Sequence, residues 1–147
     1  FMNYGFIKVA AATPEIRVAD CAYNTEAVLS LWKEADALGC HLVAFPELVL
    51  TGSTCGDLFL HKTLLDGALA GLKKLVEESN SLNSIGIIGM PLIHQGKLYN
   101  CAVTVQKGNV LSIVPKTILT SHRQFTSAPE QNTVYSDALY AIGMEEM

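Results

Sequence analysis

Apolar and polar positions along the chain follow spacings that predict strands and helices in turn. A short apolar run from Phe6 to Ala12, closed by Thr13 and Pro14, indicates a buried strand. Asn24 is placed to cap a helix that Gly39 would end. The apolar positions of this helix recur at helical spacing, at Val28, Leu31, Ala35 and Leu38.

The same order of elements repeats further along the chain. Leu42 to Phe45 form a second short apolar run that Pro46 stops, and Ile85 to Gly89 form a third. Between these runs an apolar stripe at helical spacing indicates a second helix. The stripe consists of Leu65, Leu69, Leu72 and Val76.

After Pro91 turn residues replace the helical spacing. The turn His94 to Lys97 separates two extended segments, and Lys107 to Asn109 separates Ala102 to Gln106 from Val110 to Val114. Both patterns are typical of antiparallel hairpins. Strand and helix units followed by hairpins predict an α/β layer in which helices cover one face of a mixed sheet.

Residues 120–147 do not continue this pattern. The part from Thr120 to Thr133 is polar and irregular, and only a short helix from Ser136 is indicated. A sheet that ended there would leave one edge and one face uncovered. We therefore expect residues 2–119 to form the N-terminal part of a domain, and residues 120–147 to form a segment of uncertain structure.

Composition and charge narrow the kinds of partner. Half of the 147 residues are hydrophobic and 16% are charged, which suits a buried core in a single globular domain. The net charge is −4 and basic residues do not cluster, so neither nucleic acid nor a membrane surface is an expected partner. Without a membrane-length apolar run or the features of a signal peptide, we expect a cytoplasmic protein.

Cysteine and histidine spacing indicates neither a disulfide framework nor a metal site. The cysteines form no CxxC pair and the histidines show no ligand spacing. We therefore expect reduced core thiols, and no metal or cofactor in this part of the protein. The residues concerned are Cys21, Cys40, Cys55, Cys101, His41, His61, His94 and His122.

Two ionisable residues follow predicted strands directly, each after a proline. Glu47 follows Pro46 and Lys116 follows Pro115, at strand ends of the kind where open α/β sheets bind ligands. A carboxylate against apolar walls can act as a general base, and a lysine beside it can keep it ionised and stabilise an oxyanion. Position alone favours a loop or capping glutamate and an ordinary surface lysine.

Four motifs in one order carry a resemblance to a known family. They are Phe45-Pro46-Glu47-Leu48 with Leu50-Thr51-Gly52, Cys55-Gly56-Asp57-Leu58-Phe59, Leu98-Tyr99-Asn100-Cys101-Ala102, and Val114-Pro115-Lys116-Thr117. Over residues 4–119 the chain resembles the glutaminase domain, of the nitrilase or carbon–nitrogen hydrolase type, of bacterial glutamine-dependent NAD synthetases. The first and last motifs mark the wider superfamily, and the other two narrow it to this branch. The resemblance implies a nitrilase-like αββα sandwich.

The resemblance also implies a chemistry. In that family Glu, Lys and Cys form a triad, and the first two fall on Glu47 and Lys116. A thiolate would attack the side-chain amide of glutamine, Glu47 would carry the proton, and Lys116 would stabilise the tetrahedral intermediate. The ammonia would serve NAD biosynthesis in a separate synthetase domain, the only part expected to use ATP and magnesium. Glutamine, that domain and further copies in a homo-oligomer are the implied partners.

The sequence departs from the family at three points. The family's nucleophile lies in a Cys-Glu-Asp strand end beyond the lysine, whereas no cysteine follows Cys101, so we expect this chain alone to be inactive. The family's segment with a glutamine-contacting tyrosine and a second glutamate is not matched, and whether residues are missing between Leu119 and Arg123 stays open. Ser53 stands where a tyrosine is common.

Three functions therefore stay open: a glutaminase half-site, another nitrilase-type amidase, or an inactive scaffold of that fold. The triad geometry predicts that Glu47 and Lys116 lie at adjacent strand ends on one edge of the sheet, within salt-bridge reach. An uncovered inner face of the sheet predicts either a tight homo-oligomer or a tail from Thr120 folded over it.

Overall fold

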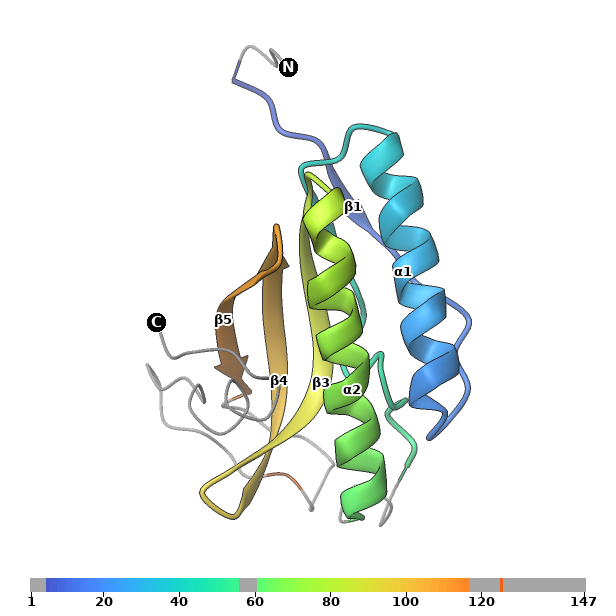
Figure 1. The fold of residues 1–147 in the computed structure, drawn as a ribbon, viewed down its shortest axis with the longest axis vertical. Helices are drawn as coiled ribbons and strands as arrows, with labels where there is room; N and C mark the ends of the chain where they lie inside the picture. The colour runs from blue at the N-terminus through green and yellow to red at the C-terminus, as the bar shows by residue number, and fades with distance from the viewer. Residues whose placement is uncertain (1–4, 56–60, 117–124, 126–147) are drawn as a thin grey trace.

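A mixed sheet with two helices on one face forms the body of the molecule (Figure 1). The computed structural model describes residues 5–55, 61–116 and 125. The five strands lie side by side in sequence order, with β1, β2 and β3 parallel and β4 and β5 each antiparallel to the strand before. The elements are β1 (Val9–Ala11), α1 (Cys21–Ala37), β2 (Leu42–Ala44), α2 (Lys62–Glu78), η2 (Ser79–Ser81), β3 (Ile85–His94), β4 (Lys97–Gln106) and β5 (Asn109–Pro115). The predicted α/β layer with a mixed sheet is confirmed.

Two tight turns set the register of the hairpins. Gln95 and Gly96 have φ of 51° and 76°, and Lys107 and Gly108 have φ of 49° and 78°. Positive φ at both central residues is the geometry of the type I′ turn, whose twist matches that of the flanking strands. Both predicted turns are therefore confirmed.

The strand β3 is longer than the sequence pattern predicted. It runs past Gly89 to His94, and Pro91 pairs with Asn100 of β4. β2 pairs only with the start of β3, so the later part of β3 has β4 as its one sheet neighbour among the described residues. Proline is tolerated there because a strand edge needs no further N–H donor.

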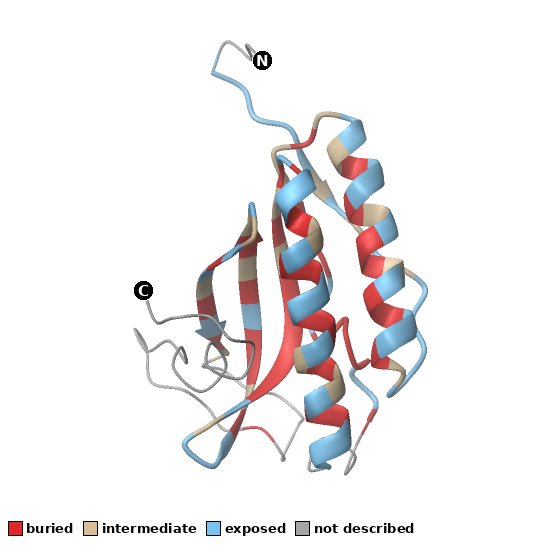
Figure 2. Cartoon of the chain, viewed as in Figure 1, coloured by how far each residue is buried: buried red, intermediate tan, exposed pale blue. Residues whose placement is uncertain are grey.

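The core lies between the helices and the sheet. Trp32 of α1 is fully buried and its indole Nε1 donates a hydrogen bond of 2.8 Å to Ser84 Oγ. Val28, Leu72 and Ile88 are also fully buried. Buried residues line the sheet-facing sides of both helices, and exposed ones line their outer sides (Figure 2). The predicted helical stripes thus mark the core except at Leu38, which lies at the end of α1 and is 63% exposed, so the prediction was wrong at that position.

The start of α1 differs from the prediction. Asp20, not Asn24, caps the helix, because its Oδ1 accepts a 3.1 Å hydrogen bond from the Tyr23 backbone N–H. Asn24 lies inside the helix and is fully buried, where its side chain makes tertiary hydrogen bonds. Gly39 follows the helix with φ of 81°, as predicted.

The first strand is also shorter and more exposed than predicted. Only Val9–Ala11 pair with β2, whereas Phe6 and Ile7 lie before the strand and are 78% and 73% exposed. This strand forms one edge of the described sheet, so a long apolar run gains little burial there. The prediction of a buried strand over the whole run was wrong.

The sheet face opposite the helices is less buried. The pleat places Val9, Ala102 and Val114 on that face, and all three side chains are exposed. Neither α1 nor α2 covers them. The predicted cover by a second copy, or by the tail from Thr120, stays a prediction. The helix predicted from Ser136 and the boundary after residue 119 lie outside the described residues.

Candidate active site

Glu47 and Lys116 lie at the same edge of the sheet, where β2 and β5 end. β3 and β4 lie between these two strands. The strand ends are therefore not adjacent, and the prediction of adjacency was wrong. They share an edge because β5 runs in the same direction as β2 and β3. The chain after β2 must therefore cross the sheet to bring the Glu47 side chain close to Lys116.

A close backbone crossing at Gly89 carries Glu47 towards β4. A Cβ atom added to Gly89 would lie 2.5 Å from the Leu48 nitrogen and 2.6 Å from the Pro46 carbonyl oxygen. The Leu50 N–H also donates to the Gly89 carbonyl, at 3.4 Å. The chain after β2 therefore passes directly over β3, and only glycine allows this approach.

The turn that follows Glu47 holds a strained residue. Leu48 has φ of 53°, a left-handed conformation that is unfavourable for a branched side chain. Its carbonyl accepts hydrogen bonds from the Thr51 and Gly52 N–H groups at 3.2 and 2.8 Å. The Leu48 side chain is fully buried, and this packing holds the strained backbone in place. Core packing thus fixes the direction in which the neighbouring Glu47 points.

Asn24 of α1 fixes the same turn from behind. Its Nδ2 donates to the carbonyls of Leu50 and Arg17 at 3.1 and 2.7 Å, and its Oδ1 accepts from the Arg17 N–H at 2.7 Å. The Ala19 N–H donates to the Thr51 carbonyl at 2.8 Å. The segment before α1, the helix and the Glu47 turn are therefore bound to one another.

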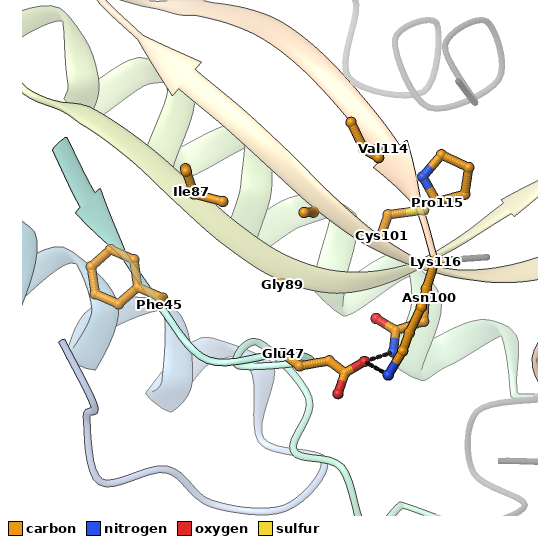
Figure 3. A pocket seen from close by; sticks show the side chains of 10 residues that line it. Phe45, Glu47, Ile87, Gly89, Asn100, Cys101, Val114, Pro115 and Lys116 are labelled. Carbon is orange, nitrogen blue, oxygen red and sulfur yellow. Dashed lines mark hydrogen bonds and ion pairs between the residues drawn. The ribbon is translucent and has the colours of Figure 1, made fainter. Parts of the chain in front are cut away.

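Two donors meet on one oxygen of Glu47 (Figure 3). Lys116 Nζ lies 2.6 Å from Glu47 Oε1, and Asn100 Nδ2 lies 2.6 Å from the same oxygen. The prediction of salt-bridge reach is therefore confirmed, although the catalytic roles themselves stay a prediction. The side chains of Lys116 and Glu47 are 37% and 47% exposed, and ion pairs at such exposure contribute little to stability. The short distance between the lysine and the carboxylate is therefore better explained by a role in catalysis than by a contribution to stability.

Asn100 belongs to the site, although the sequence indicated it only as part of a family motif. The structure places its side chain on Glu47, and its carbonyl accepts a 2.7 Å hydrogen bond from the Lys116 N–H. Asn100 is only 3% exposed. A buried amide in a strand needs hydrogen-bond partners. The asparagine within the segment from Leu98 to Ala102 could therefore have been recognised as a candidate site residue from the sequence.

A pocket of about 340 Å³ opens beside these three residues. Its walls are apolar and its polar groups gather at one end, which is typical of small-molecule sites. Figure 3 shows the residues that line it, from β3, β4 and the ends of β2 and β5. Besides Glu47, Asn100 and Lys116 they are Phe45, Ile87, Gly89, Cys101, Ala102, Val114 and Pro115.

Three of the cysteines lie in surroundings that suppress thiolate formation. Burial raises the pKa of Cys101 to about 12, although this residue lines the pocket. Burial, with smaller contributions from Cys55 and Asp20, raises the pKa of Cys21 to about 11, and burial also raises the pKa of Cys55. Reactive cysteines need exposure and a lowered pKa. All four cysteines are free and buried, as predicted for core thiols.

The described residues hold no cluster of three His, Cys, Asp or Glu side chains that could bind a metal ion. Within residues 5–55, 61–116 and 125, no helix has the length and apolar character needed to cross a membrane.

The chain is similar in sequence to known carbon-nitrogen hydrolases. The carbon-nitrogen hydrolase family matches residues 8–145. Glutamine-dependent NAD(+) synthetases of Mycobacterium tuberculosis H37Rv and Mycobacterium leprae are 38% and 34% identical over 123 residues, which are 84% of this chain and 18% of those proteins. The chain thus spans less than a fifth of the length of these curated relatives.

Solved structures show the same fold. A glutamine-dependent NAD(+) synthetase from Cytophaga hutchinsonii superposes with a TM-score of 0.80 at 26% identity, covering 86% of this chain and 22% of that one. A variant of the Nesterenkonia AN1 amidase from the nitrilase superfamily gives 0.75 at 16% identity, covering 84% and 49%. The predicted nitrilase-like fold is confirmed, and the described residues supply one helix layer and one sheet of it.

Proposed function

Because this chain belongs to the carbon–nitrogen hydrolase family, we propose that it supplies the general base and the lysine of a glutaminase site. The observation that carries the proposal is the meeting of Lys116 and Asn100 on Glu47 Oε1, both at 2.6 Å, beside an apolar pocket. The family hydrolyses carbon–nitrogen bonds, and the similar synthetases are named for glutamine. Glutamine is therefore the proposed substrate.

The proposed reaction has two halves. Glu47 accepts the proton of a cysteine thiol as the sulfur attacks the amide carbon, and Lys116 stabilises the oxyanion that forms. Glu47 then returns the proton to the departing nitrogen, which leaves as ammonia, and a thioester remains. A water molecule, deprotonated by Glu47, attacks the thioester and releases glutamate and the thiol.

We propose that none of the four cysteines of this chain is the nucleophile. Cys101 comes nearest to the site, but it is only 2% exposed and burial raises its pKa to about 12. A thiol in that environment is protonated at neutral pH and a poor nucleophile. The nucleophile is then supplied by another part of a longer protein, and the chain alone does not hydrolyse glutamine.

The wider role we propose is ammonia supply for NAD biosynthesis. The similar synthetases are more than five times as long as their matched segment, which leaves room for the proposed synthetase domain. That domain would use ATP and magnesium to amidate deamido-NAD. Association of copies into a homo-oligomer belongs to the same proposal.

A nitrilase-type amidase for another amide is the second candidate. The departures at Ser53 and after Leu119 favour it, because they leave the contacts to glutamine unassigned. The Glu47 and Lys116 pair fits either substrate. An inactive scaffold is the third, and it would keep the fold without turnover.

Ammonia release by the full-length protein that contains this chain separates the three candidates. We expect release from glutamine and a loss of about 10²–10⁴-fold in kcat for Glu47→Gln, the usual contribution of a general base. Faster turnover of simple aliphatic amides than of glutamine would favour the second candidate. No turnover of any amide would favour the scaffold.

A further inference from the structure

We propose that Asn100 is a positioning residue that holds both Glu47 and Lys116 in their working geometry. The proposal rests on the glutaminase function proposed above. It starts from one buried side chain with a hydrogen bond to each partner, through its amide group to Glu47 and through its backbone carbonyl to Lys116.

The side-chain bond fixes the rotation of the Glu47 carboxylate. The last torsion of a glutamate has a broad energy minimum, so an unrestrained carboxylate samples many orientations. Asn100 Nδ2 and Lys116 Nζ both donate to Oε1 at 2.6 Å, and two donors on one oxygen select one orientation. Figure 3 shows the other carboxylate oxygen of Glu47 pointing away from both donors. Oε1 is thus the oxygen through which Asn100 and Lys116 position the carboxylate.

The backbone bond fixes the start of the Lys116 side chain. The Lys116 N–H donates to the Asn100 carbonyl at 2.7 Å, which continues the pairing of β5 with β4 by one residue beyond Pro115. β4 is flanked by β3 and β5, so Asn100 lies on an interior strand of the described sheet. One rigid residue therefore sets the positions of two partly exposed side chains.

A neutral amide suits this position better than a carboxylate or an aliphatic side chain. A carboxylate would repel Glu47 and compete with it for Lys116. An aliphatic group of equal size would remove the amide donor to Glu47 Oε1. Asn100 is 3% exposed, so water cannot readily replace the missing donor.

Asn100→Leu in the full-length protein tests the proposal by its kinetics. We expect kcat for ammonia release to fall about 10–100-fold while KM changes less than about threefold, because substrate binds but meets a misoriented base. Thr104→Val is the matched control. It removes a polar group from the same face of β4, away from Glu47, and should leave kcat within about twofold. An unchanged kcat in Asn100→Leu would overturn the proposal.

Asn100→Asp adds a readout that a purely structural role would not move. At acid pH the introduced carboxyl is protonated and can donate to Glu47 Oε1, so activity relative to wild type should recover as pH falls. Asn100→Leu should lose activity to the same extent at every pH. The titratable groups around this position are Glu47, Lys116 and Cys101. The pKa of Cys101 is raised to about 12, so its thiol stays protonated over the pH range of the assay. Equal fractional losses in both variants at all pH values would overturn the proposal.

Crystal structures of the two full-length variants give a readout independent of activity. We expect the Glu47 carboxylate to leave its place beside Lys116 in Asn100→Leu at neutral pH, with the fold unchanged. If it stays, the positioning role is refuted, even in a protein that releases ammonia. If wild-type protein releases no ammonia from glutamine, the proposed function fails, and the position of the carboxylate still decides the role of Asn100. Should Asn100→Leu fail to fold, Asn100→Asp carries both tests.

Discussion

β3 carries two glycines that face opposite sides of the sheet. A Cβ on Gly86 would lie 2.7 Å from the Trp32 ring, beneath the helices, whereas a Cβ on Gly89 would lie 2.5 Å from the Leu48 backbone nitrogen, beneath the Glu47 turn. The first glycine makes room for a side chain of the core, and the second makes room for a backbone crossing at the site. A ring can shift by small rotations, but a crossing chain cannot move without moving the residues it carries.

The two sides of the sheet therefore have different roles. The helix side supplies most of the stability, and the opposite side sets the position of the site residues. On the helix side, stability comes from buried apolar volume such as Trp32, Leu72 and Ile88. At the site edge, geometry comes from hydrogen bonds on exposed groups and from a strained turn at Leu48. Substitutions on the helix side should therefore change only the free energy of unfolding, whereas substitutions at the site edge should change turnover as well.

Trp32→Ala should have the largest effect on stability. The substitution empties a fully buried position and leaves the Ser84 hydroxyl without its indole partner, so the free energy of unfolding should fall by about 3–5 kcal/mol. Urea denaturation followed by circular dichroism measures it. Leu38→Ala, at a position 63% exposed in the same region, is the control and should cost less than about 0.5 kcal/mol. A similar cost for both would show that the helix layer is not the main source of stability.

Substitution of the two glycines gives the most direct test of the difference between the two sides of the sheet. Gly86→Ala should lower the free energy of unfolding by about 1–3 kcal/mol through overpacking against Trp32, and should leave kcat of the full-length protein near wild type. Gly89→Ala should cost at least as much, because its clash is with backbone atoms, and should also lower kcat about 100-fold, because the displaced crossing moves Glu47. Denaturation and ammonia release measure the two effects. Equal kcat in both variants would contradict the proposed division.

Asp36→Asn should have the smallest effect, and it depends on pH. Burial alone would raise the pKa of Asp36, but hydrogen bonds from Ser84 and Asn83 and the charge of Lys107 together hold it below its ordinary value. The carboxylate therefore adds stability above its unfolded-state pKa, and this stability is lost as pH falls through the folded-state value. We expect a cost below about 1 kcal/mol at pH 7, screened by solvent, that disappears below about pH 4. Denaturation midpoints of the wild type and the variant, measured across pH, test this expectation. A difference between the two midpoints that grew in acid would refute it.

Local features of the fold could be predicted from the sequence. The turns at Gln95-Gly96 and Lys107-Gly108 are set by neighbouring residues, and the stripe of α2 is set by spacing alone, so both were found correctly. The cap of α1 was assigned wrongly to Asn24 because this side chain bonds to Leu50, which is distant in sequence. No local pattern could show that contact.

The site could be predicted only in part for the same reason. Family resemblance selected Glu47 and Lys116, and the structure brings them together. Their supposed adjacency was wrong because strand order is a tertiary property: two hairpin strands lie between them, and Gly89 lets the chain cross one of these. Asn100 was overlooked as a site residue because its role appears only when β4 is placed beside the Glu47 turn.

The hydrogen bonds of Asn24 have a consequence for local unfolding. They join the start of α1 to the turn that carries Glu47, and the Ala19 N–H bond to Thr51 adds a second connection. Segments bound in this way open together as one cooperative unit. The amide protons of Leu50 and Gly52 should then exchange with solvent as slowly as those of the α1 interior, unlike the rapid exchange usual for surface loops. The proposed base would thus open no faster than the helix α1 to which its turn is bound.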